Sequence, residues 1–559
     1  MKKRVLLETL SLPLLSFLLL LPLLGYGFLS DDFPLIVANP RLQSWSLFFQ
    51  NLLTPFFSFP ANPQLHYWRP TTLLSYALEL RLWGVSPWGF HLTNILLHTA
   101  NTLLLYLLLK RFRPEGALPW TASLLFLLHP AHGENIAWIS GRTDLLAFLF
   151  LALSLLFRLE YEERKRGLPL SLLFFALALL SKEAALLFLP LLFLLFPSKG
   201  LKNRLLLLLP YLSLLPLYLF LHQKAASTLA LNRGLLWADI PLALRSAGAY
   251  VRILLFPNLP APYFPMGELT VHPLLYTLSG LCGISLILLI IRFRREFPLT
   301  FPGLSLLLFL LPSLLPRFLP TWPPIAPRFA YLASPLAALF FTELALWAFK
   351  RGLRIPAFLL LLFLIFSWGT LLRLHLPFFR DDDTYIRTMS LRYPEEESFL
   401  FQLSFKEAQR GDLRKALLLV DKGLALSPSS PWVDYSRKGR TLRANILILL
   451  GREAEGEQEV ERLLRANPSP EEGYSLHLLR AILLERRGNG EGALEELTLA
   501  GRLGKTPELL LRTARLQVRL GRREEALRSL EEALNLGLDP KIAERERVEI
   551  QNRRESERE

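Results

Sequence analysis

The chain has little cysteine and lacks the short motifs of soluble catalysis. Its 559 residues include one cysteine, Cys282, inside an apolar stretch. Neither a disulfide nor a cysteine metal cluster can therefore hold this fold together. The sequence has no glycine-rich phosphate loop and no serine–histidine–aspartate motif in a supporting context. Any chemistry must come from other polar groups.

Apolar residues make up 52% of the chain, which is too many for a soluble protein of this length. The formal net charge of +15 does not indicate nucleic acid, because much of the excess sits in short loops. Topology and contact with anionic lipid headgroups explain charge in that position. We therefore predict an integral membrane protein that has membrane lipids, and no nucleic acid, among its partners.

The N-terminus has the layout of a signal peptide, with basic residues 2–4 before the apolar stretch 10–28. It lacks a convincing small-residue cleavage site, so we predict an uncleaved first transmembrane helix.

Basic clusters and polar motifs alternate at the breaks between apolar segments. By the positive-inside rule, the basic clusters face the cytoplasm. These clusters are residues 2–4, 110–113, 158–166, 199–204, 292–295 and 350–354. They accommodate eleven crossings near residues 10–29, 88–109, 117–129, 135–157, 168–180, 184–197, 205–221, 273–291, 301–315, 329–349 and 355–375. The prediction is a multi-pass protein of the cell (inner) membrane, with a cytoplasmic N-terminus and an extracytoplasmic C-terminal part.

The predicted membrane domain, residues 1–380, contains a long outer loop at residues 30–87. Residues 71–83 in this loop carry Glu79 and Arg81 and supply too few apolar residues to cross a bilayer. They are better interpreted as an interfacial helix, as are residues 241–256.

After residues 380–383 the composition changes to arginine and glutamate with helical periodicity. Small residues recur at fixed spacing in a pattern that matches the second helix and turn of tetratricopeptide repeats. We predict a repeat domain over residues 395–540, whose stacked helix pairs form a groove that docks proteins. Residues 541–559 form a charged tail that is expected to be frayed or disordered.

The polar motifs converge on the face opposite the cytoplasm, where an enzyme with a lipid-carried substrate needs them. Asp31 and Asp32 directly follow the first span. They could be a solvated helix end, but a carboxylate held near hydrocarbon can be tuned as a general base.

The next motif places His129, His132 and Glu134 in a short turn that contains proline. Two histidines and a carboxylate could ligate a divalent metal, but this spacing fits no specific metal motif. Polar groups that cap a turn are the preferred interpretation, and no metal is assigned.

Three cations complete the set. Arg142 could pair with a phosphate, or with Asp144 or Glu134. Lys182 could merely neutralise Glu183, although an ionisable pair inside a membrane is a functional hypothesis by default. Arg328 could be an interfacial anchor, or could join the other two in binding a phosphate leaving group.

One further stripe lies within the second span. His91, Asn94, His98 and Asn101 recur at helical spacing, and such a polar stripe is best explained by hydrogen bonds between helices.

Several of these segments together resemble one family. The segments are residues 31–32, 67–70, 89–98, 129–146 and 180–183, with support from residues 328–332 and the repeats. They resemble the transmembrane and tetratricopeptide-repeat O-mannosyltransferases of the C-type glycosyltransferase superfamily, and the compact loops are those of a bacterial relative. The expected fold is all-α: a polytopic bundle of about eleven transmembrane helices followed by a tetratricopeptide-repeat α-solenoid.

The resemblance implies a sugar, a mannose-like hexose, held on a polyprenyl phosphate outside the membrane. An acidic residue after the first helix deprotonates the acceptor in this family. Asp31 matches the first acidic position of that motif and Asp32 the second. Arg142, Lys182 and Arg328, together with Arg69, are expected to face the lipid phosphate, and His129, His132, Glu134, Asp144 and Glu183 are assigned to the surrounding shell or a possible divalent metal.

The expected function is therefore an inverting glycosyltransferase that uses a polyprenyl-phosphate sugar. The acceptor is a protein hydroxyl of serine or threonine, or alternatively a lipid or an envelope polysaccharide. A different class remains open, a non-enzymatic membrane scaffold whose repeats recruit proteins.

Overall fold

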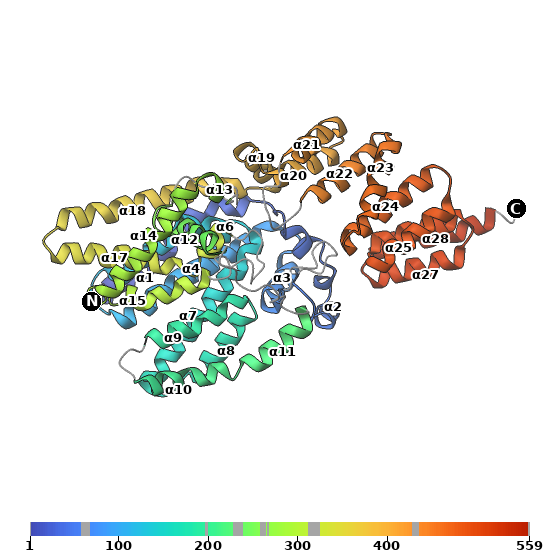
Figure 1. Ribbon diagram of the computed structural model, residues 1–559. Coiled ribbons are helices and arrows are strands. Elements are labelled where there is room, and N and C mark those ends of the chain that lie inside the picture. Colours follow the sequence, from blue (N-terminus) through green and yellow to red (C-terminus); the bar gives the residue numbers. More distant parts are fainter. Residues whose placement is uncertain are drawn as a thin grey trace. The chain divides into compact units, whose positions relative to one another are not determined.

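The computed structural model describes residues 2–56, 67–195, 200–226, 239–257, 264, 268–310, 325–426 and 435–556. Within these ranges the regular elements are helices, without strands, which confirms the predicted all-α fold (Figure 1). The chain divides into two compact units, of which the first ends at Tyr385 and the second begins at Ile386.

The first unit is a bundle of long and short helices. Its elements are α1 (Lys2–Leu20), η1 (Leu21–Gly25), η2 (Phe33–Val37), η3 (Pro40–Leu42), α2 (Trp45–Gln50), α3 (Pro70–Trp83), α4 (Pro87–Phe112), α5 (Leu118–Leu127), η4 (Pro130–His132), α6 (Gly133–Ala137), η5 (Ile139–Gly141), α7 (Arg142–Arg164), α8 (Leu168–Leu179), η6 (Glu183–Leu187), α9 (Phe188–Leu195), α10 (Leu201–Leu212), α11 (Leu215–Ala226), α12 (Asp239–Leu255), α13 (Glu268–Val271), α14 (Pro273–Arg292), α15 (Thr300–Gly303), η7 (Leu304–Leu310), η8 (Pro327–Ala330), α17 (Ser334–Lys350), α18 (Arg354–His375) and η9 (Leu376–Phe379).

In the described part of the chain, six helical segments are long and apolar enough to cross a membrane. They are Leu6–Gly25, Pro87–Phe112, Ile139–Arg164, Leu201–Ala225, Pro273–Arg292 and Arg354–Phe379. Three further predicted spans, at 117–129, 168–180 and 184–197, correspond to shorter apolar helices. Residues 311–315 and 196–197 of the predicted spans lie outside the described residues. These helices support the prediction of a multi-pass membrane protein. The number of crossings, eleven, stays a prediction.

The helix predicted within the outer loop is present as α3. Its 14 residues reach about 21 Å, which is short of the roughly 30 Å of hydrocarbon. The second such segment, α12, has 17 residues.

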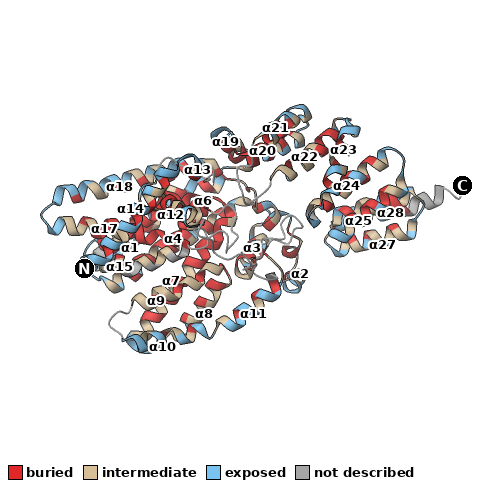
Figure 2. Cartoon of the chain, in the orientation of Figure 1, coloured by how far each residue is buried: buried red, intermediate tan, exposed pale blue. Residues whose placement is uncertain are grey.

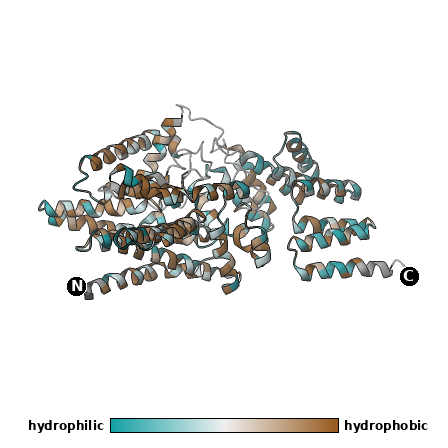
Figure 3. Ribbon diagram, turned by 90° about the horizontal axis from the view of Figure 1, so that it is seen from below, coloured by the Kyte–Doolittle hydropathy of each residue, from teal (hydrophilic) through white to brown (hydrophobic). Residues whose placement is uncertain are grey.

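The bundle buries polar side chains among its helices and exposes large apolar side chains on its outer surface. On α18, Phe358, Phe363 and Phe366 are more than 60% exposed, whereas His91, His98 and Asn101 on α4 are fully buried. Figures 2 and 3 show this contrast, since α18 is largely pale blue in the burial view, and brown apolar residues lie along many of the helices. Apolar surface turned outward is what a lipid environment requires.

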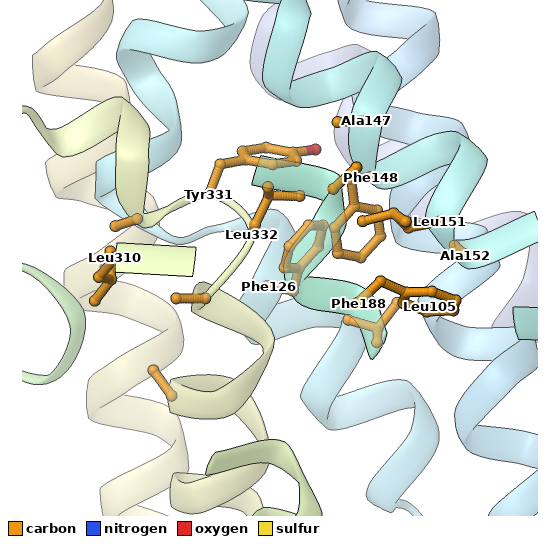
Figure 4. Packing of buried hydrophobic residues seen from close by; sticks show 14 of the residues in the cluster. Leu105, Phe126, Ala147, Phe148, Leu151, Ala152, Phe188, Leu310, Tyr331 and Leu332 are labelled. Carbon is orange, nitrogen blue, oxygen red and sulfur yellow. The ribbon is translucent and has the colours of Figure 1, made fainter. Parts of the chain in front are cut away.

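The interior of this unit holds a large apolar cluster. Figure 4 shows Tyr331 and Leu332 beside Phe126 and Phe148. The Tyr331 ring lies 5.5 Å from the Phe126 ring and 5.8 Å from the Phe148 ring. This cluster ties the segment after Arg328 to α5 and α7.

Helices α12 and α14 approach closely through glycine. A Cβ on Gly248 would collide with the carbonyl oxygen of Tyr276 and lie 2.8 Å from the nitrogen of Gly280. We therefore expect Gly248→Ala to destabilise the unit by about 1–3 kcal/mol, since backbone must move to admit the methyl group. A lowered thermal unfolding midpoint in detergent would show this. Gly200→Ala is the control, because nothing lies within 4 Å of its Cβ, and equal midpoints for both variants would contradict the packing.

The second unit stacks helix pairs. Its elements are α19 (Asp382–Arg392), which begins in the first unit, α20 (Glu397–Gln409), α21 (Leu413–Ala425), α22 (Tyr435–Leu449), α23 (Glu453–Arg465), α24 (Pro470–Arg486), α25 (Gly490–Leu503), α26 (Pro507–Arg519), α27 (Arg523–Asn535) and α28 (Pro540–Ser556). Gly411, Gly451, Gly488 and Gly521 turn the chain within successive pairs at φ between 77° and 87°, where glycine is favoured. The small residues predicted at the helix contacts, among them Ala416, Ala493 and Ala526, are fully buried. The tetratricopeptide-like repeat architecture is therefore present.

The expectation of a frayed C-terminal tail is wrong over most of its length. Residues Pro540–Ser556 form α28. Ala543 and Ile550, seven residues apart on one helical face, are buried against Leu510, Leu530 and their neighbours. Charged residues on the other faces concealed this apolar stripe in the sequence.

Candidate active site

The turn that carries Asp31 and Asp32 is held by hydrogen bonds from several elements. Asp32 is fully buried; its Oδ2 accepts from the Leu29 amide at 2.9 Å, and its Oδ1 accepts from the Ser140 amide at 2.8 Å. The Trp138 indole donates to the Leu29 carbonyl at 3.2 Å. Asp32 thus forms hydrogen bonds both within the turn and to the segment before α7, and so holds the two together.

Asp31 has different surroundings. It is partly exposed, and its carboxylate has no hydrogen bond to any residue that the structure describes. Burial raises the pKa of Asp31; Arg328 acts against this, and Asp382 and Glu134 add to it. Of the two aspartates, Asp31 is the one whose oxygens can reach a substrate.

Glu134 holds Arg328 beside this carboxylate. Glu134 is buried, forms an ion pair with the Arg328 guanidinium, and accepts from the Arg328 amide at 3.0 Å. The guanidinium lies 4.8 Å from the Phe329 ring and 5.4 Å from the Trp138 ring. Burial acts to lower the pKa of Arg328, but the charge and hydrogen bonds of Glu134 outweigh it, so the pKa is raised and the cation is secure.

Two further cations are held in the same manner. Lys182 bonds to Asp144 and lies 5.1 Å from the Phe329 ring. Arg69 pairs with Glu183, with Nη2 2.9 Å and Nε 3.2 Å from its oxygens. Arg69 also stacks 4.3 Å from the Tyr67 ring.

Arg69, Lys182 and Arg328 together form what we call the cation cluster. Burial lowers the pKa of Lys182, Asp144 opposes this, and both arginines lower it further, so the three charges lie within electrostatic reach of one another. Their side chains remain 13%, 11% and 17% exposed. Each cation uses only part of its donors on its carboxylate, and the remaining N–H groups suit a phosphate.

Arg142 pairs with a carboxylate other than Asp144 and Glu134, the two considered for it. Its side chain is fully buried and ion-paired with Glu79. Its Nε donates to Asn94 at 2.7 Å, and its Nη2 donates to the Phe90 carbonyl at 2.9 Å. With Ser75 as a further acceptor, the guanidinium is surrounded by protein, so no phosphate contact is assigned to it below.

His129, His132 and Glu134 each have separate partners within the protein. The Leu254 carbonyl lies 3.1 Å from Nε2 of His129, and the Ala131 amide donates to its Nδ1. Nε2 of His132 lies 2.7 Å from the Ser334 hydroxyl, while Glu134 holds Arg328. Among the described residues no three histidine, cysteine or acidic side chains are grouped as a metal site. These residues fit the turn-capping interpretation.

The polar stripe of α4 forms the predicted contacts between helices. Asn94 donates to the carbonyls of Ile136 and Trp138, and Asn101 donates to the Leu145 carbonyl at 2.9 Å. Nδ1 of His98 lies 2.9 Å from the Tyr331 hydroxyl. The stripe is confirmed as a set of hydrogen bonds that holds the motif segments together.

Two partners were missed in the sequence. Glu79 was noted only as a charge unsuited to a crossing, yet it neutralises Arg142. Asp382 was noted only as part of residues 380–383, after which the amino-acid composition changes. Its Oδ1 accepts a hydrogen bond from the Ser30 amide at 2.9 Å. Glu79 shares a helix face with Thr72, Ser75 and Tyr76, and this polar stripe was the available signal for it. The contact between Ser30 and Asp382, 352 positions apart, had no signal in the sequence.

Part of the chain is similar to known mannosyltransferases. Residues 70–222 match the family model of dolichyl-phosphate-mannose-protein mannosyltransferases. The chain is 34% identical over 176 residues to protein O-mannosyl-transferase Tmtc1 of Drosophila melanogaster, which covers 31% of this chain and 20% of that protein. It is 43% identical over 89 residues to protein O-mannosyl-transferase TMTC2 of Homo sapiens, covering 16% and 11% of the two chains. The resemblance predicted from the motifs is confirmed.

The extent of these matches is limited. The matched region spans about a fifth of the length of Tmtc1. Among solved structures, yeast Tom70 aligns over 88% of this chain and 92% of its own at 12% identity and a TM-score of 0.23, a level that carries no argument.

Proposed function

We propose that this chain is an inverting membrane glycosyltransferase that moves a mannose-like hexose from a polyprenyl phosphate to an extracytoplasmic acceptor, the hydroxyl of a protein serine or threonine. The observation that carries the proposal is one carboxylate without a hydrogen-bond partner among the described residues, Asp31, beside a cation of the cluster, Arg328. A general base next to an anion site is what this transfer needs. The family match over residues 70–222 supports the class of donor.

The reaction is a single displacement. The acceptor oxygen attacks the anomeric carbon while Asp31 takes the hydroxyl proton. The bond between that carbon and the phosphate oxygen breaks, and the electron pair leaves with the polyprenyl phosphate. Arg328, Lys182 and Arg69 stabilise the charge that develops on the leaving phosphate.

The carboxylates that pair with the cation cluster stabilise it and do not compete with the lipid phosphate for it. Three adjacent cations without partners would repel one another and be costly to bury. Glu134, Asp144 and Glu183 fix each cation in one orientation before the donor arrives. Such preorganisation avoids reorganisation during the reaction.

The repeats in this proposal bind the acceptor and take no part in the chemistry, because stacked helix pairs offer a groove for docking. Acceptor proteins and other proteins of the envelope are the expected partners. In this proposal the site and the repeats lie outside the cytoplasm, as the positive-inside rule predicts from the basic clusters.

The test is to incubate the purified full chain with labelled polyprenyl-phosphate hexoses and with envelope protein fractions. Label that becomes attached to protein and is released by β-elimination supports the proposal. If label were found only in lipid or polysaccharide, the acceptor would be that molecule and not a protein. If none of the donors were consumed, the proposed function would be wrong.

The pH dependence of transfer follows from the surroundings of Asp31. A base acts only when deprotonated, so the rate falls as the pH drops through its pKa. Because burial raises the pKa of Asp31, we expect the acid limb of kcat/KM to lie above the value of about 3.9 of an ordinary aspartate. A pH profile of transfer measures this, and a limb at or below the ordinary value would contradict the environment described.

A further inference from the structure

The turn before the base contains a residue in an unusual backbone conformation. Ser30 has φ of 44°, in the left-handed region that side chains other than glycine rarely adopt. Such a conformation persists only where surrounding bonds hold it. Ser30 directly precedes Asp31, so the conformation of this residue directs the base.

The surrounding bonds come from opposite sides. From within the turn and from the segment before α7, Asp32 and Trp138 bind the backbone of Leu29. From the far end of the unit, Asp382 accepts from the Ser30 amide at 2.9 Å, and the Gly27 amide donates to the Arg380 carbonyl at 2.8 Å.

The segment Arg380–Tyr385 is itself well defined. The Asp381 carboxylate accepts from the Thr384 amide at 2.7 Å and so caps the first turn of α19. Asp382 is in that first turn. The Asp382 carboxylate also lies within electrostatic reach of Asp31. The segment therefore faces the base turn, and it lies outside residues 70–222, which match the family model.

We infer that Asp382 is a positioning residue for the base: its carboxylate holds the Ser30 amide, keeps the turn in its left-handed conformation and aims Asp31 at the acceptor. This inference rests on the proposed function. It adds the segment after the last long apolar helix to the catalytic apparatus, with a role in kcat and none in donor binding.

The test compares Asp382→Ala, Asp382→Asn and Asp381→Asn in the full chain. Alanine removes the acceptor, so kcat should fall by about tenfold to a hundredfold through misplacement of the base, with unchanged affinity for polyprenyl phosphate. Asparagine keeps an oxygen that accepts from Ser30 and should retain most of the rate. Asp381→Asn is the matched control, since it removes one negative charge from the same turn and keeps the cap.

A second change separates positioning from general damage. Glycine at position 30 adopts the left-handed conformation without support from Asp382. In the Ser30→Gly background, Asp382→Ala should therefore cost little of the transfer rate, whereas in the parent it costs about tenfold or more. A merely structural defect would not be repaired in this way. An Asp382→Ala protein within about twofold of the parent rate, or a double variant as slow as Asp382→Ala, would overturn the inference.

A measurement that needs no activity keeps the inference distinct from the proposed function. Hydrogen exchange of the Ser30 amide should accelerate in Asp382→Ala and stay unchanged in Asp381→Asn, because only the first loses the acceptor. Unchanged exchange in Asp382→Ala would overturn the positioning role whether or not transfer is found. Accelerated exchange in a chain without transferase activity would leave the bond established and refute the proposed function alone.

Discussion

Asp31→Asn is expected to lower the rate of sugar transfer by about a hundredfold or more, the usual cost of losing a general base. Asparagine keeps the shape of the side chain but cannot take up the acceptor proton. Affinity for polyprenyl phosphate should persist, because Arg69, Lys182 and Arg328 keep their partners. The measurement is the initial rate of transfer together with equilibrium binding of polyprenyl phosphate.

Asp32→Asn is the matched comparison. Both oxygens of Asp32 accept from backbone amides, and an amide side chain can serve only one of them. Its principal effect should be a lower thermal unfolding midpoint with a milder loss of rate. If the Asp31 variant turned over normally while Asp32→Asn abolished transfer in a folded protein, the roles of the two residues would be exchanged.

Arg328→Gln separates the base from the anion site. It removes a cation and leaves Asp31 in place, so affinity for polyprenyl phosphate should fall together with the rate. A variant that binds the lipid phosphate as tightly as the parent would remove Arg328 from the cation cluster.

The part of this molecule that the sequence predicted best rests on local pattern. Helical periodicity and glycine spacing defined the repeats, and Gly411 and Gly451 occur at the predicted turns. The stripe of His98 and Asn101 was interpreted correctly because polar groups inside a membrane must find partners on other helices. In these cases the residues that decide the structure are neighbours in sequence.

The site itself depends on pairs that are distant in sequence. Lys182 and Glu183 are adjacent and could have neutralised each other, but Lys182 pairs with Asp144 and Glu183 pairs with Arg69. A phosphate, Asp144 and Glu134 were the partners considered for Arg142. Glu79 was noted only as a charge unsuited to a crossing, yet the structure pairs it with Arg142. A sequence motif predicts which charged residues gather at a site. Which of them form ion pairs depends on how the helices pack, and the motif does not contain that information.

Arg142→Met is expected to destabilise the membrane unit by about 3–5 kcal/mol, the usual cost of removing one partner from a buried ion pair. Glu79 would be left as a buried carboxylate, and Asn94 and the Phe90 carbonyl would lose their donor. Glu79→Gln should destabilise for the same reason, by leaving the guanidinium uncompensated. The measurement is the thermal unfolding midpoint in detergent, with protease resistance as a second readout.

The double variant Glu79→Gln with Arg142→Met completes the cycle. If the two residues act mainly on each other, its destabilisation should be well below the sum of the single losses. Arg69→Gln is the control, because it breaks an ion pair that is partly exposed. The side chains of Arg69 and Glu183 are 13% and 26% exposed, so water can compensate part of the loss and the destabilisation should be smaller. An Arg142→Met protein with the parent midpoint and a lost affinity for polyprenyl phosphate would return Arg142 to the donor site. A lowered midpoint with unchanged affinity in the folded fraction would establish Arg142 as a structural residue. It begins α7 directly after the segment in which Trp138 and Ser140 donate hydrogen bonds to the base turn.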